Sequence, residues 1–148
     1  MRNANTDREF EHYVEVQVSR DFAWRFWTNI ANWAFDPSVE SVELDGPFAA
    51  GTKGVTKTRG GGPVEWKLVD VQNRSAALIE ITLPGATISF RWRYEDAAGG
   101  GVRITQRVTL EGERADDYAE GMAMLESGVP QGMSKLAEEM IKAAAEQA

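Results

Sequence analysis

The last third of the chain carries one apolar stripe at helical spacing. From residue 118 onward, apolar side chains recur every three or four residues, which is the period of one helix face. The stripe consists of Tyr118, Met122, Leu125, Val129, Met133, Leu136, Met140 and Ala144. Pro130 interrupts it, and proline lacks the amide hydrogen that would bond the carbonyl of Glu126. The pattern therefore predicts either one kinked helix or two helices in line.

Most of the preceding chain alternates with a period of two, which is typical of strands with one buried face. The alternation predicts a first strand at 10–18 and then strands at 39–44, 52–58, 64–71, 76–83, 87–95 and 102–110. The gaps between the later strands hold a few residues, rich in glycine, which suits hairpins. Parallel strands would need long crossovers, so we expect an antiparallel meander. Its apolar face is the natural partner of the C-terminal stripe.

A short helical region separates the first two strands. Ser19 is placed to cap it, and Phe22 and Trp27 share one helical face. Trp24 falls nearly opposite Phe22, so it is either exposed or in contact with a second element. Asp36-Pro37 is a turn signal that ends this region.

Composition limits the classes of function. The 148 residues suit one domain spanning 1–148, and we expect residues 1–8 to be disordered or frayed. The net charge of −7 argues against nucleic-acid binding and against electrostatic docking on membranes. There is no cysteine, hence no disulfide or thiolate site. No apolar run resembles a signal peptide or a spanning helix, so we expect a cytoplasmic protein without membrane insertion.

The chain resembles a known superfamily over roughly residues 9 to 147. The resemblance rests on the run 14–24 (VEVQVSRDFAW), on Trp33 to Pro37, on the strand starts at 51–55 and 64–71, on the Gly-rich hairpin before 102–106 and on the closing helix around 136–140. These segments are similar to the START-like group, also called SRPBCC, of polyketide cyclases/dehydrases and lipid-transport proteins. The resemblance implies an α+β helix-grip fold, in which a seven-stranded curved antiparallel sheet wraps around a long C-terminal helix. It also implies short helices between strands 1 and 2 and a cavity between the sheet and the C-terminal helix.

Candidate catalytic groups are few. His12 is the only histidine, and no Gly-x-Ser-x-Gly motif accompanies it, so a hydrolase triad is not indicated. Alternation places His12, Tyr94, Gln106 and Asp70 on inward strand faces, although a bulge could turn Asp70 outward. Each is either hydrogen-bonded locally or kept for a ligand, because an unpartnered buried polar group costs about 1–3 kcal/mol. His12, Tyr94 and Asp70 are the acid/base candidates. We expect neither a metal site nor a cofactor.

Aromatic and methionine side chains suggest a ligand site. The chain has five tryptophans, and an aromatic-lined pocket with few polar groups is typical of sites for apolar small molecules. The same side chains could instead fill the core completely, with methionine filling gaps. If the resemblance holds, the ligand-binding candidates are Trp66, Phe90, Trp92, Tyr94, Gln106, Met122, Met133 and Met140.

Three hypotheses follow. The favoured one is a module that binds an apolar or aromatic small molecule, such as a lipid, a sterol-like compound or a polyketide. The second is a cyclase/dehydratase-type enzyme that uses one or two polar cavity residues. The third is an interaction protein that uses the outer sheet face of Arg91, Arg93, Arg103 and Arg107, although acidic neighbours make a solvated surface the simpler interpretation. Homodimers through a sheet edge or a helix side are both compatible with the pattern.

Overall fold

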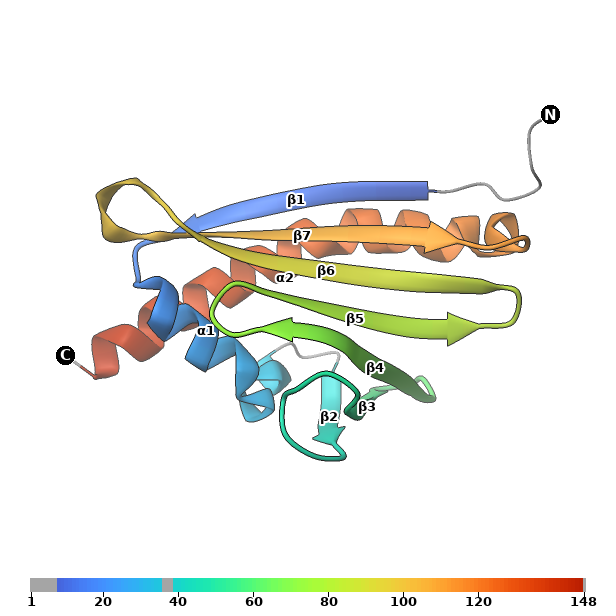
Figure 1. Ribbon diagram of the computed structural model, residues 1–148, viewed down its shortest axis with the longest axis horizontal. Coiled ribbons are helices and arrows are strands. Elements are labelled where there is room, and N and C mark those ends of the chain that lie inside the picture. Colours follow the sequence, from blue (N-terminus) through green and yellow to red (C-terminus); the bar gives the residue numbers. More distant parts are fainter. Residues whose placement is uncertain (1–7, 36–38, 148) are drawn as a thin grey trace.

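The computed structural model describes residues 8–35 and 39–147. One antiparallel sheet of seven strands is backed on one face by helices (Figure 1). The strands are β1 (Arg8–Val16), β2 (Val39–Leu44), β3 (Lys53–Thr58), β4 (Pro63–Gln72), β5 (Ala76–Leu83), β6 (Ala86–Asp96) and β7 (Val102–Glu111). The helices are α1 (Arg20–Thr28) and α2 (Ala119–Glu146), with short 3-10 segments η1 (Ile30–Phe35), η2 (Ala98–Gly100) and η3 (Ala115–Tyr118). The predicted helix-grip fold is confirmed.

The strand order is β1-β7-β6-β5-β4-β3-β2. Strands β2 to β7 form a meander, whereas β1 pairs with β7, so the first and last strands are neighbours. The predicted turn at Asp36-Pro37 lies outside the described residues. So do residues 1–7 of the start that we expected to be frayed, while Arg8 begins β1.

Local sequence explains where α1 begins. The hydroxyl of Ser19 accepts a hydrogen bond from the amide of Phe22 at 3.1 Å, which satisfies a donor that the first helical turn leaves unpaired. Asp21 lies in that first turn and pairs with Arg25 one turn later at 2.9 Å. The buried face of α1 is formed by Ala23, Trp24 and Trp27, so Trp24 is in contact with a second element rather than exposed.

The C-terminal stripe forms a single helix, α2, with Pro130 in its interior, so the alternative of two helices in line is wrong. Met122, Met133, Leu136 and Met140 are its buried residues. The helix crosses the sheet on the side away from the viewer in Figure 1 and packs mainly along β1, at one margin of the sheet.

The core divides into two apolar clusters. The larger surrounds α1 and includes Trp24, Trp27, Met133 and Met140; the smaller lies near η3 and the start of α2 and includes Leu110 and Met122. Phe90 and Val129 pack against both clusters and join them. The middle of the concave face is therefore spanned by a few partly buried side chains.

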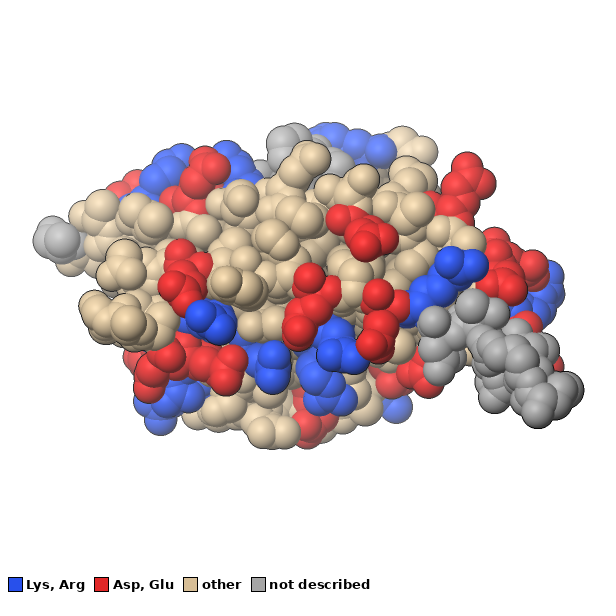
Figure 2. Space-filling view, turned by 90° about the horizontal axis from the view of Figure 1, so that it is seen from above, with Lys and Arg blue, Asp and Glu red and all other residues tan. Residues whose placement is uncertain are grey.

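The outer face of the sheet is charged and internally paired. Glu9, Glu11 and Glu15 of β1 form ion pairs with Arg107, Arg93 and Arg103 at 2.6, 3.5 and 2.7 Å. Figure 2 shows side chains of both signs interspersed on the surface that includes this margin. Three of the four arginines considered for a partner surface thus already have acidic neighbours in the same chain.

Candidate functional site

An aromatic cluster fills the end of the concave face beneath α1. The ring of Trp27 lies at its centre, 4.8 Å from Trp92 and 5.5 Å from Tyr94 between centroids. Phe48, from the connection between β2 and β3, meets the edge of Trp27 at 5.3 Å. These rings come from a helix, a strand and a loop, so they tie α1 and the sheet together. Phe48 was not among the residues predicted from the sequence, because it lies outside any periodic segment.

Trp66 extends this cluster towards β3. Its indole is nearly parallel to that of Trp33, with centroids 5.4 Å apart and planes inclined by 22°. Its ring nitrogen donates a hydrogen bond to the hydroxyl of Thr56 at 2.9 Å. A Cβ atom on Gly54 would overlap the indole, so this neighbour in β3 must be glycine for the ring to lie there.

The concave face is less well covered in the middle of the sheet. Phe90 and Trp92 point to this face from β6, which has strands on both sides, yet both remain half-buried. Ile88 of β6 and Ile81 of β5 are half-buried as well. The backbone of α2 lies mainly along β1, and these four side chains of β5 and β6 remain partly exposed to solvent. We call the surface formed by these half-buried side chains, Ile81, Ile88, Phe90 and Trp92, the concave groove.

Two polar side chains flank the concave groove. Gln106 of β7 is paired in register with Trp92 on one side and with His12 of β1 on the other. Gln106 is 6% exposed and His12 is half-buried. Neither side chain makes a hydrogen bond to the described part of the chain. A carboxamide can both donate and accept, so this row offers a ligand polar contacts beside an aromatic surface.

Tyr94 lies one row further along β6. It is 1% exposed, and its hydroxyl has no hydrogen-bond partner among the described residues. The edge of Trp24 faces its ring at 5.2 Å. Removal from water raises the pKa of Tyr94 well above its ordinary value, so the phenol is protonated at neutral pH and can act as a proton donor but not as a base.

Asp70 is placed differently. The pairing of β4 with β5 shifts register between Leu68 and Asp70, so a bulge interrupts the alternation. Asp70 pairs with Leu78, on the outer face, and its carboxylate accepts a hydrogen bond from the side-chain Nε2 of Gln72 at 3.0 Å. The predicted inward orientation of Asp70 is therefore wrong, and the bulge, which the sequence left as an alternative, turns this side chain outward.

The predicted ligand-binding residues fall into two groups. Trp66, Tyr94, Met133 and Met140 are buried in the larger cluster, and Met122 is buried in the smaller one. Phe90, Trp92 and Gln106 border the concave groove. The structure therefore brings together the β6 and β7 candidates, whereas the three methionines form packed core.

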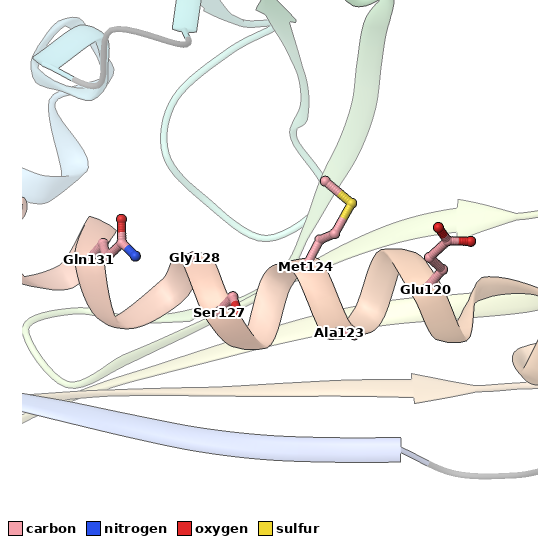
Figure 3. A pocket seen from close by; sticks show the side chains of 6 residues that line it. All are labelled: Glu120, Ala123, Met124, Ser127, Gly128 and Gln131. Carbon is pink, nitrogen blue, oxygen red and sulfur yellow. The ribbon is translucent and has the colours of Figure 1, made fainter.

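Two hollows lie elsewhere on the surface. One, of about 420 Å³, is lined by Trp24, Thr28, Phe48, Ala49, Ala50, Val71 and Asn73, between α1 and the sheet. The other, of about 460 Å³, is lined by residues of α2 alone: Glu120, Ala123, Met124, Ser127, Gly128 and Gln131. Figure 3 shows these side chains along one side of the helix, and Met124 is 72% exposed. This second hollow is a shallow dent on the face opposite the buried stripe.

Two kinds of site have no support in the described ranges. Residues 8–35 and 39–147 contain no group of three or more His, Asp or Glu side chains arranged to hold a metal ion. No helix in those ranges is long and apolar enough to cross a membrane.

Comparison with protein families gives the assignment. The family described as polyketide cyclase / dehydrase and lipid transport matches residues 7–145. The chain belongs to this family. Members of this family bind hydrophobic ligands or act as cyclases. No curated protein matches the sequence.

Solved structures of similar fold include both enzymes and other proteins. Norcoclaurine synthase from Thalictrum flavum, in complex with dopamine and hydroxybenzaldehyde, is 13% identical, with a TM-score of 0.74 over 94% of this chain and 89% of that one. Ara h 8.0201 is 16% identical, with a TM-score of 0.70 over 93% and 99%. The di-domain ARO/CYC BexL from the BE-7585A biosynthetic pathway is 17% identical, with a TM-score of 0.68 over 89% and 49%. At these identities the likeness shows the family's fold alone.

Proposed function

We propose that this family member binds an apolar or aromatic small molecule, of the lipid, sterol-like or polyketide class, in the concave groove. One observation carries the proposal: Phe90 and Trp92 remain half-buried on the concave face of a strand that has neighbours on both sides. Large apolar side chains in such a position are usually covered. Covering them with a ligand would remove apolar surface from water, which is favourable by about 25 cal/mol per Å².

The polar groups beside the groove suit a ligand with one polar end. Gln106 and His12 lie in register on the β1 side of Trp92. A hydroxyl or carbonyl group of the ligand could pair with the Gln106 carboxamide while its apolar body covers Phe90 and Trp92. The family description, which includes lipid transport, and the aromatic molecules bound to the similar norcoclaurine synthase are consistent with ligands of this kind.

The first test is native mass spectrometry of the purified protein, followed by extraction of any retained small molecule. Binding of anilinonaphthalene sulfonate, followed by its fluorescence, then locates the site. Phe90→Ala should weaken this binding by about tenfold, whereas Arg91→Ala, the next residue on the outer face of β6, should leave it unchanged. Met124→Ser serves as a second control, because it changes the exposed dent on α2. The proposal fails if Met124→Ser weakens binding and Phe90→Ala does not.

A second candidate function is a cyclase/dehydratase-type reaction in the same groove. The observation that favours it is the pairing of His12 with Gln106, which itself pairs with the half-buried Trp92, because an imidazole can serve as a general acid or base. The protonated phenol of Tyr94 could act as an acid but not as a base. With any substrate that the chain turns over, His12→Ala should reduce kcat, while Asp70→Asn, on the outer face, should not. Equal turnover by both variants and the parent chain would exclude this role for His12.

A further inference from the structure

The indole of Trp33 is held between two other indoles. Its centroid lies 5.7 Å from that of Trp27 and 5.4 Å from that of Trp66, with interplanar angles of 26° and 22°. Each neighbouring pair of rings is thus close to parallel, and the three indoles form one continuous stack. Trp33 comes from η1, whereas Trp27 belongs to α1 and Trp66 to β4.

The middle ring of this stack is more exposed to solvent than the two outer rings. The two outer rings are almost fully covered, with Trp27 3% exposed and Trp66 6% exposed. The middle ring, Trp33, is half-buried. The middle ring therefore keeps part of its surface in contact with solvent, while the two rings on either side of it, which we call its walls, are covered.

Both walls are held by contacts that do not involve Trp33. Trp66 is seated over Gly54 and bonded to the Thr56 hydroxyl at 2.9 Å. Trp27 is packed against Trp92 at 4.8 Å and Tyr94 at 5.5 Å. The gap between them would therefore persist if Trp33 left it. A preformed apolar gap of this kind can accept an aromatic molecule in place of a removed side chain.

Trp33 also has contacts outside the stack: Phe48 meets its ring edge-on at 6.4 Å, and η1 packs against β2. Its ring nitrogen donates a hydrogen bond to the backbone carbonyl of Trp27 at 2.6 Å. It belongs to a 3-10 segment of six residues. Segments of this type rarely exceed three or four residues, because their hydrogen bonds have poorer geometry than those of an α-helix. The backbone hydrogen bonds of η1 are thus weaker than those of α1 and β4, which carry the two walls.

We propose that Trp33 occupies, in the free protein, a slot that receives the ring of the ligand. The ligand would displace Trp33 and stack between Trp27 and Trp66. The carbonyl of Trp27 loses its donor when Trp33 leaves, and an unpaired buried carbonyl is unfavourable. The ligand class is therefore a planar aromatic compound of about the size of indole that carries its own hydroxyl or N–H donor, such as a phenol or an indole. This inference rests on the proposed function and specifies its ligand.

The test uses naphthol as the probe and nuclear magnetic resonance of the tryptophan indole N–H groups. The Trp33 signal is assigned with Trp33→Phe, and the Trp66 signal with Trp66→Phe. At saturating naphthol, the Trp33 N–H should shift and exchange with solvent at least on the order of tenfold faster, because its bond to the Trp27 carbonyl is broken. The Trp66 N–H, bonded to Thr56, should stay protected and serves as the internal reference.

The outcomes separate the two proposals. If naphthol binds and perturbs Trp92 but leaves the Trp33 N–H protected, the slot is excluded while the concave groove remains. Lauric acid serves as a second probe, for ligands of the lipid class. If neither naphthol nor lauric acid binds, both proposals are overturned. Trp33→Ala should also bind naphthol on the order of tenfold more tightly than the parent chain, since no side chain has to leave first. Trp24→Ala, which removes a ring of the same cluster outside the stack, should give no such gain; an equal gain in both variants would overturn the slot.

Discussion

The indole of Trp66 lies directly across Gly54 of the neighbouring strand. The ring occupies the volume that any side chain at position 54 would need. This seat holds the ring flat against β3, so that it can stack on Trp33 and bond to Thr56. One glycine in an edge region of the sheet thus determines where a wall of the aromatic cluster lies.

Gly54→Ala should destabilise the protein. Its methyl group would displace an indole that is fixed by a stacked ring and a hydrogen bond, and such overpacking costs about 1–3 kcal/mol. Urea unfolding measures the change in the free energy of unfolding. Gly62→Ala is the matched control, because a Cβ atom there meets nothing within 4 Å. Equal stability of the two variants would show that Trp66 moves freely.

Tyr94→Phe should leave the protein as stable as the parent chain or make it more stable. The variant keeps the ring that packs against Trp24 and removes a buried hydroxyl without a partner, whose burial costs about 1–3 kcal/mol. Thermal and urea unfolding at neutral pH measure this difference. A clear loss of stability would instead indicate that the hydroxyl is bonded in solution, for example by a water molecule.

The same substitution should change the response to alkaline pH. The pKa of Tyr94 is raised in the folded state, so above about pH 10 the unfolded chain loses this proton while the folded chain keeps it. The contribution to stability is complete below the unfolded pKa and is lost as pH rises towards the folded pKa, by about 1.4 kcal/mol per pH unit. Between pH 10 and 11 the stability of the parent chain should therefore fall more steeply than that of Tyr94→Phe. Parallel curves would contradict a raised pKa.

Gly128→Ala should stabilise α2. Gly128 lies in the interior of the helix, and a Cβ atom there meets nothing within 4 Å. Alanine is favoured over glycine inside a helix by about 1 kcal/mol. Ala123→Gly, at an exposed position of the same helix, should lower stability by a similar amount. Thermal unfolding of both variants checks the pair, and a loss of stability in Gly128→Ala would indicate that this face is covered in solution.

Trp92→Ala should affect both stability and binding. The ring packs on Trp27 at 4.8 Å but is half-buried, so the loss should be near the lower end of the range for such truncations, about 3 kcal/mol. At a temperature where the variant is still folded, anilinonaphthalene sulfonate should bind at least about tenfold more weakly. Unchanged affinity in a folded variant would remove Trp92 from the ligand site.

The alternation of the sequence predicted the strands well. β2 and β5 have the predicted bounds, because turn residues interrupt the alternation on both sides of each. The orientation of Asp70 could not be predicted from strict alternation, because one extra residue at the Leu68–Asp70 register shift reverses the side chains that follow it in β4. Single sequence positions do not reveal where such a bulge lies.

The aromatic cluster was predicted only in part. Alternation indicated that Phe90 and Trp92 share the concave face, which the register confirms. The burial of Trp24 and the stacking of Trp33 depend on how α1 and η1 approach the sheet. Short helical segments carry too few residues to define that approach, so tertiary packing decides which rings meet.

The pairing of Arg8 with Leu110 has a consequence for synthesis of the chain. β1 leaves the ribosome first, yet its partner β7 follows after all the other strands, and α2 follows later still. Until then the edge of β6 and the apolar concave face have no cover. Such long-range closure slows folding and exposes surfaces that aggregate. Translation that stalls before residue 102 should therefore yield a chain that depends on chaperones.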